Sequence, residues 1–163
     1  MDYRKAIIGL TVLLLWAGIF SCAPKQTALL PTNLKGLRLQ STVRGQAAEA
    51  MINRLHNKEV TSKDNYIGHY QGQGAKAVLY VSEFQSQQEA EALLVSMRDR
   101  IKTTAKVFGH FRRMSARGLT VYSVLGLGQV HYFYRQGHVL IWLAVDPAVA
   151  REAFEAVLAK SWG

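Results

Sequence analysis

The chain opens with a short apolar segment that ends close to its only cysteine. Arg4 and Lys5 precede an apolar run over residues 6–20, and Cys22 follows that run. A basic start before so short a run is typical of a secretory signal peptide, because a membrane-spanning helix needs about 20 apolar residues. We therefore expect residues 1–21 to be removed. The remaining 142 of the 163 residues contain one cysteine, so they must fold around an apolar core without an internal disulfide.

The residues around Cys22 resemble the lipobox of bacterial lipoproteins, in which the cysteine is lipidated and becomes the first mature residue. The stretch reads Ile19-Phe20-Ser21-Cys22, and only Phe20 departs from the expected residue types. The resemblance implies a lipid-anchored protein of the cell envelope. In a Gram-negative cell, Ala23 after the cysteine implies the outer membrane, facing the periplasm. Two alternatives stay open, namely ordinary secretion through a small-x-small cleavage site and an uncleaved N-terminal helix.

The mature chain has the length of one domain on a short tether. Residues 22–33 contain Pro24 and Pro31 and are interpreted as the lipidated tether. The 11 residues that follow the cysteine span at most about 36 Å when extended. We expect residues 34–163 to form a single domain that stays close to its membrane.

Hydrophobic periodicity predicts an α+β domain, an antiparallel sheet with about three helices. We expect strands at residues 37–44, 65–71, 75–84, 119–125, 130–135 and 138–145, with an edge strand at 111–115. We expect helices at residues 46–56, after the capping box of Ser86 and Glu89, and after a cap at Asp146 followed by Pro147. The pattern of a His-Tyr pair, a hairpin and a helix occurs twice, at His69 and 62 residues later at His131, which suggests two hairpin–helix pseudo-repeats.

The last hairpin carries the first candidate binding surface. A two-residue turn at residues 136–137 would pair Phe133 with Leu140 and His131 with Trp142. One face would then carry Val139, Ile141, Leu143 and Val145, and the other His131, Phe133, Leu140 and Trp142. Both faces are largely apolar, so either the sheet is covered on both sides or one side is a docking surface. We take Tyr80, Phe133 and Trp142 as the candidate partner-binding aromatic face.

A basic segment provides the second candidate surface. Residues 98–117 hold seven Lys and Arg residues against one acidic residue, Asp99. Clustered charge of this kind favours anionic partners, although a plain solvated surface is the alternative. The candidate residues for binding an anionic lipid or an acidic envelope partner are Arg98, Lys102, Lys106, Arg112, Arg113 and Arg117. The expected envelope location argues against nucleic acid.

The sequence offers little for catalysis or cofactor binding. No nucleophile motif is present. Gly126-Leu127-Gly128 lacks the third glycine of a dinucleotide fingerprint, so we expect a bulge or a tight strand connection there. His69 and His131 hold matching places in the suggested repeat and would approach each other across the sheet. A two-histidine haem or metal site is one hypothesis. A hydrogen-bonded histidine within the sheet is the one we favour, with no metal and no cofactor.

From Gly45 onward the chain resembles a group of uncharacterised bacterial envelope lipoproteins. The resemblance lies in the stretches MINRLHNKEV, YIGHY, AVLYVSEF and LGLGQVHYFYRQGHVLIWLAV. It implies envelope location and a single domain, and no activity. We predict a non-enzymatic binding or accessory module for an anionic or protein partner, anchored in the bilayer through Cys22. The alternative is a periplasmic carrier of a small molecule or a cofactor such as haem, and a hydrolase ranks last.

Overall fold

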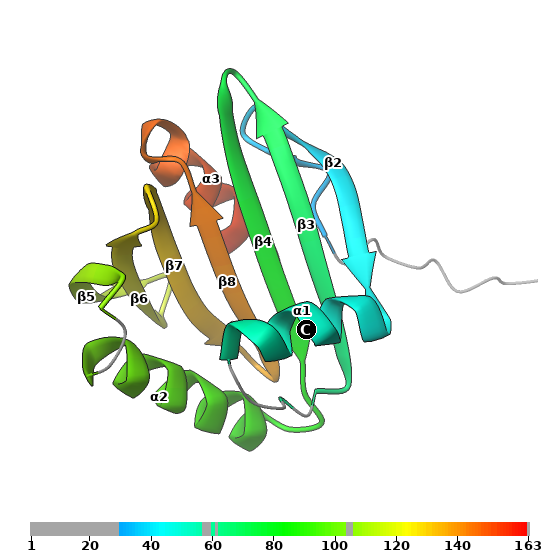
Figure 1. The fold of residues 1–163 in the computed structure, drawn as a ribbon, viewed down its shortest axis with the longest axis vertical. Helices are drawn as coiled ribbons and strands as arrows, with labels where there is room; N and C mark the ends of the chain where they lie inside the picture. The colour runs from blue at the N-terminus through cyan, green and yellow to red at the C-terminus, as the bar shows by residue number, and fades with distance from the viewer. Residues whose placement is uncertain (1–29, 57–59, 61, 104–105, 163) are drawn as a thin grey trace, which may run out of the picture.

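A curled antiparallel sheet of eight strands forms the centre of the molecule, with three α-helices packed against it (Figure 1). The computed structural model describes residues 30–56, 60, 62–103 and 106–162. Cys22 and the predicted signal peptide lie outside the described residues. The prediction of an α+β fold with an antiparallel sheet and about three helices is confirmed, although strands make up more of the domain than helices.

The strands are β1 (Asn33–Leu34), β2 (Leu37–Arg44), β3 (Asp64–Gly72), β4 (Ala75–Glu83), β5 (Phe108–Ala116), β6 (Leu119–Gly126), β7 (Gln129–Gln136) and β8 (Val139–Val145). The helices are α1 (Gly45–His56), α2 (Gln87–Thr103) and α3 (Ala150–Leu158), the last preceded by the short 3₁₀ helix η1 (Pro147–Val149). The strand order is β1-β2-β3-β4-β8-β7-β6-β5, so β4 and β8 meet at the centre and β5 lies at an edge, as predicted.

Most hairpins turn on a residue followed by glycine. Leu127 and Gly128 join β6 to β7, and their φ angles are 54° and 76°. Two positive φ angles define the type I′ turn that suits the twist of paired strands, and glycine adopts them without strain. Of the bulge and the tight connection expected at residues 126–128, the structure shows the tight connection.

The last hairpin differs from its prediction. Gly137 occupies the first position of the turn, with φ of 59°, and residue 136 already belongs to the strand ladder. Phe133 consequently pairs with Trp142, and His131 pairs with Ala144. The predicted register was wrong by two residues along β8. A slip of two residues leaves every side chain on its face, so the predicted division of this hairpin into two faces is confirmed.

Two separate apolar cores cover the two faces of the sheet. One core joins Leu79, Ile141 and Leu143 of the central strands to Phe154 and Val157 of α3. The other core joins alternate residues of the same strands to α1 and α2, through Ile52, Ala90, Leu93, Leu94 and Met97. Helices therefore lie on both sides of the sheet.

Side chains at the start of α2 and at the end of β8 form hydrogen bonds that hold these connections in place. The Glu89 amide donates to the Ser86 hydroxyl oxygen at 3.2 Å, which confirms the predicted cap of α2. Asp146 holds the N-cap position of η1 and Pro147 lies in its first turn, as predicted, but the Asp146 side chain makes no capping hydrogen bond. Its carboxylate instead accepts from the Lys76 amide at 2.9 Å and from the Gln129 side chain at 3.0 Å, which ties the end of β8 to its two neighbouring strands.

The domain begins before the predicted end of the tether. Leu30 is buried, and the Pro31 carbonyl accepts a hydrogen bond from the Tyr70 hydroxyl at 2.9 Å. The core on the α3 face therefore includes a residue of the segment predicted to be the tether.

Candidate functional site

A row of aromatic side chains crosses the sheet on the face that α1 and α2 cover. Tyr122, Phe133, Trp142 and Tyr80 occupy paired positions on β6, β7, β8 and β4. Paired residues of antiparallel strands share a face and lie close enough for their rings to touch. The ring centroids of Phe133 and Trp142 are 5.0 Å apart and the planes differ by 14°, while Tyr122 and Phe133 are 5.3 Å apart. The structure thus brings together the three aromatic residues chosen from the sequence, but Phe133 is completely buried, so of the three only Tyr80 and Trp142 can meet a ligand.

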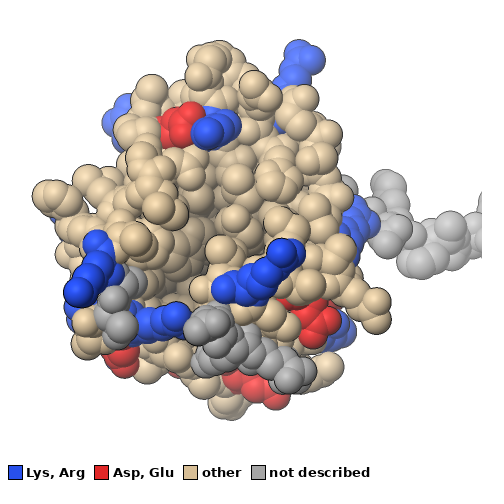
Figure 2. All heavy atoms as spheres, in the orientation of Figure 1, with Lys and Arg blue, Asp and Glu red and all other residues tan. Residues whose placement is uncertain are grey.

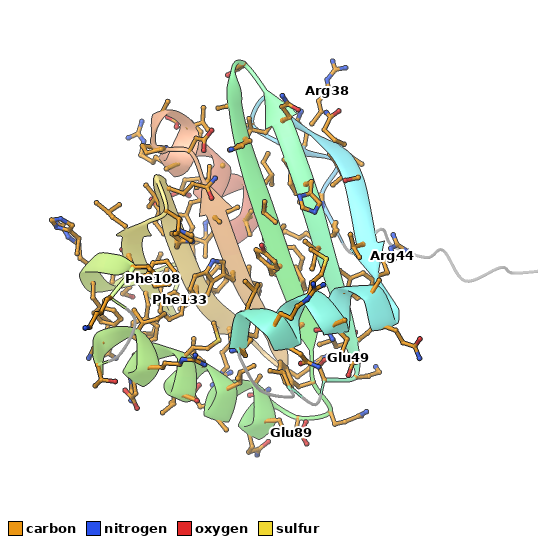
Figure 3. All side chains as sticks on the ribbon, viewed as in Figure 1. Arg38, Arg44, Glu49, Glu89, Phe108 and Phe133 are labelled. Carbon is orange, nitrogen blue, oxygen red and sulfur yellow. The ribbon has the colours of Figure 1, made fainter. Side chains whose placement is uncertain are left out.

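Two members of this aromatic cluster were not predicted. Tyr122 could have been found by applying the two-residue turn rule to residues 127–128, which pairs it with Phe133. Phe108 has no such signal, because it reaches the cluster from the far edge of the sheet. Phe108 and Phe133 are labelled in Figure 3, and both lie against Trp142, with centroid distances of 5.9 and 5.0 Å.

Helix α2 lies over this row and separates two clefts. Leu93 and Met97, four residues apart, line an apolar cavity on one side. Leu94, Arg98 and Lys102, also four residues apart, line a basic groove on the other side. Residues four apart stack on one side of a helix, so the sequence of α2 presents a different chemistry to each cleft.

The apolar cavity lies between α1, α2 and the sheet and has a volume of about 370 Å³. Its floor is formed by Val78, Tyr80 and Ser82 of β4, Leu140, Trp142 and Ala144 of β8, and Gln129 and His131 of β7. The C-terminal end of α1 and the connection into β5 complete its walls. Small-molecule sites usually occupy roughly 300–1,000 Å³, so this volume suits a small ligand. Figure 2 shows this face of the molecule hollowed.

Exposed apolar side chains gather at the mouth of the cavity. Among the described residues, four large hydrophobic side chains are exposed, and three of them, Leu55, Val107 and Leu127, line this cavity. Their exposed fractions are 63%, 59% and 73%. They come from α1, the connection into β5 and the β6–β7 turn, so their convergence is a product of the fold. A single exposed leucine is ordinary, whereas a cluster around an opening is typical of a binding surface.

Polar side chains of the cavity floor form hydrogen bonds within the protein. The Trp142 indole N–H donates to Nδ1 of His131 at 3.1 Å, and Nε2 of His131 lies 3.0 Å from the Gly126 carbonyl oxygen. These two bonds assign the proton of the ring to Nε2. The Ser82 hydroxyl donates to the Asn65 side chain at 2.7 Å. The polar atoms of Trp142, His131 and Ser82 are therefore already engaged within the protein, which favours an apolar ligand.

His131 is a neutral, hydrogen-bonded residue of the sheet, as favoured from the sequence. It is buried, and burial lowers the pKa of its imidazole while the hydrogen bond to Gly126 opposes that shift. His69 lies in the same row of the sheet, but β4 and β8 stand between the two strands. Three strand spacings amount to roughly 14 Å. The expected approach of the two histidines was therefore wrong.

The basic groove lies between α2 and the outer strands β5 and β6, with a volume of about 560 Å³. Its cationic side chains are Arg98, Lys102, Arg113 and Arg135. Arg98 is paired with Asp99 at 2.7 Å, and this hydrogen bond lowers the pKa of the Asp99 carboxyl. Lys102 and Arg113 form no ion pair with any described residue, and the Lys102 ammonium lies 4.7 Å from the centre of the Phe111 ring. These two cations leave the groove open to an anion.

The sheet divides the predicted basic residues between its two faces. Arg113 pairs with Tyr122 and faces the groove, whereas Arg112 pairs with Ser123 and faces the α3 side. Arg117 also belongs to the α3 side, 3.9 Å from Glu155 of that helix. Lys106 is exposed in the connection next to the cavity mouth. Of the six predicted basic residues, the structure brings Arg98, Lys102 and Arg113 into one groove and leaves Lys106, Arg112 and Arg117 outside it.

No protein-family model, curated protein or solved structure matches the chain. Within the part of the chain that the structure describes, no three His, Cys, Asp or Glu side chains are grouped so that they could hold a metal ion. None of the described helices is both long and apolar enough to cross a membrane. The candidate site is therefore defined by its own geometry, an apolar cavity beside a basic groove.

Proposed function

We propose that the domain is a non-catalytic binding module that holds an apolar small molecule in the cavity between α1 and α2. The observation that carries this proposal is the apolar cavity with three exposed hydrophobic side chains at its mouth. Apolar surface left in water is unfavourable by about 25 cal/mol per Å². A ligand that fills the cavity and covers the mouth removes this surface from water. The carrier function, an alternative from the sequence, is thus better supported by the geometry than a purely electrostatic one.

Haem is a poor candidate for this ligand. Of the histidines that line the cavity, only His131 lies in its floor, and both of its ring nitrogens are engaged in hydrogen bonds. Coordination to iron would break one of these bonds and leave a buried polar group unpaired, which is costly. We therefore propose an apolar ligand without a metal.

The two tryptophans of the mature chain provide a direct test. Trp142 lies in the cavity floor, whereas Trp162 is buried in the core on the opposite face. We expect a brominated long-chain alcohol to quench Trp142 in the Trp162→Phe variant, because bromine quenches indole fluorescence only at short range. The matched Trp142→Phe variant, whose remaining reporter is Trp162, should show little quenching. Equal quenching of both variants, or of neither, would contradict the proposal.

We also propose that the chain is anchored in the cell envelope by lipid on Cys22, facing the periplasm if the cell is Gram-negative. Support comes from the lipobox resemblance, which lies outside the described residues. We expect labelled palmitate to be incorporated into the wild-type protein and not into the Cys22→Ala variant. The labelled protein should remain with membranes until detergent is added. A mature N-terminus at another residue would count against the anchor.

A second candidate function is binding of an anionic lipid or an acidic protein in the basic groove. It is favoured by Lys102 and Arg113, two cations that lack ion-pair partners in the structure. The sheet supplies a matched pair of variants, since Arg113 faces the groove and Arg112 faces away. Arg113→Glu should weaken association with anionic vesicles several-fold at low salt, and Arg112→Glu should do so less. Equal effects of the two substitutions would remove the groove as the site.

The pseudo-repeat is retained as a proposal about how the domain is built. The hairpins β3–β4 and β7–β8 are each followed by a helix, and their second strands pair at the centre of the sheet. The two helices pack on opposite faces, however, so any repeat has diverged in how its helix returns. Superposition of the two hairpin–helix units tests this, and agreement limited to the hairpins would speak against a repeat.

A further inference from the structure

The mouth of the apolar cavity is bordered by positive charge. Arg100 follows Leu93 and Met97 on the same stripe of α2, one turn beyond the cavity lining. Its guanidinium donates to the carbonyl oxygen of His56, which itself lines the cavity. Lys106 is exposed and directly precedes Val107 of the mouth. Figure 2 shows Lys and Arg atoms in blue along the lower margin of the hollowed face.

The cavity has no acidic lining residue in the part of the chain that the structure describes. Asp99, the neighbour of Arg100 in sequence, is engaged by Arg98 on the side of the basic groove. The cavity therefore combines an interior without ionised groups, an apolar mouth and a cationic margin. An apolar cavity with positive charge at its opening is complementary to a molecule with an apolar chain and a negatively charged end.

We propose that the ligand of the cavity is a long-chain fatty acid. The chain lies on the aromatic floor, and the carboxylate lies at the mouth near Arg100 and Lys106. This inference rests on the proposed function, because it requires that the cavity holds a ligand. A volume near the lower end of the range for ligand sites suits one chain rather than two. Each buried methylene raises affinity about fourfold, while the charged margin selects the head group.

The test compares three brominated ligands of equal chain length that differ only at the head, namely an acid, an alcohol and a trimethylammonium compound. Quenching of Trp142 in the Trp162→Phe variant of the mature protein reports binding of each. We expect the acid to bind about tenfold more tightly than the alcohol at low salt, because two exposed charge pairs contribute to it. The cationic ligand should bind most weakly.

A charge substitution localises the effect. Lys106→Glu should lower the affinity for the acid about fivefold and leave the affinity for the alcohol nearly unchanged. Arg38→Glu is the matched control, since it changes net charge equally at an exposed position at the far edge of the sheet (Figure 3). It should affect neither ligand. Unfolding curves of both variants should overlay that of the parent protein.

The possible outcomes separate this inference from the function on which it rests. If acid and alcohol bind equally, or Lys106→Glu and Arg38→Glu behave alike, the fatty acid is excluded while the apolar cavity remains a binding site. If none of the three ligands quenches Trp142, the proposed function fails as well. If sedimentation shows that the unliganded chain self-associates through the mouth, the cavity is an interface between copies and the proposal is overturned.

Discussion

The two faces of the sheet carry similar apolar side chains, but the helices pack against them differently. On the α3 face, Leu79, Ile141 and Leu143 are completely buried beneath the helix. On the other face, Tyr80 and Trp142 from the same strands are half-buried, and α1 and α2 leave a cavity between them. Close packing is what stabilises a core, and empty volume lowers stability. Both faces therefore contribute a packed core, and the α1/α2 face also keeps an open cavity, which is where we propose that a ligand binds.

The largest effect should come from deleting the same side chain on each face. Leu143→Ala removes a fully buried leucine and should lower the free energy of unfolding by about 2–5 kcal/mol. Leu127→Ala removes an exposed leucine of the cavity mouth and should change the free energy of unfolding by less than about 0.5 kcal/mol. Urea unfolding measures both. Losses of similar size would mean that the two faces do not differ as described.

An intermediate effect should come from adding volume to each face. Ala77 is buried in the α3 core, and Ala77→Leu should lower the free energy of unfolding by about 1–3 kcal/mol through overpacking. Ala144 lines the cavity, where Ala144→Leu has room. We expect this variant to retain its stability and to bind the brominated alcohol about tenfold more weakly, as measured by quenching of Trp142. An Ala144→Leu variant with unchanged ligand affinity would place the ligand elsewhere.

The smallest effect concerns pH. Burial lowers the pKa of His131 below the value of about 6.5 expected in the unfolded chain. The unfolded state therefore takes up this proton more readily, so the contribution of His131 to stability is complete above about pH 6.5 and is lost as the pH falls through its folded pKa. Protonation also removes the acceptor of the Trp142 N–H.

Urea unfolding at pH 7.5 and pH 5 provides the measurement. Wild-type protein should lose more stability over this interval than the His131→Gln variant, whose side chain does not titrate. Burial and the opposing hydrogen bond to Gly126 are the causes of the pKa shift of His131 among the described residues, and its ring contacts, Phe108 and Trp142, are uncharged. An equal loss in the two proteins would show that His131 titrates normally.

Secondary structure was largely predictable from the sequence, while the exact pairing was less so. The strands and helices follow from the spacing of apolar residues, which is a local property. The register of the last hairpin was wrong because the turn rule was applied with glycine second, as it is at Gln73-Gly74. In the last hairpin Gly137 comes first in the turn. The sequence of residues 135–138 does not distinguish a turn at 136–137 from one at 137–138. Period-two alternation still placed Phe133 and Trp142 on one face.

The clefts could be predicted only in part. The separation of Arg112 from Arg113 follows from strand alternation, once residues 111–115 are taken as a strand. The cavity, by contrast, depends on how far α1 lies from α2, and this distance is set by packing between segments remote in sequence. Leu55, Val107 and Leu127 are separated in the chain and appear ordinary there. Their convergence is visible only in the folded domain.

The edge strand β5 also affects whether copies of the protein can associate through their sheets. An uncovered strand presents free peptide groups to which another chain can add. In β5 the ladder shifts between Gly109 and Arg112, and His110 has a φ of 54°, so the backbone is bent there. Two arginines then project from its two sides. A neighbouring molecule would meet an irregular, like-charged border, which disfavours edge-to-edge association between copies of the domain.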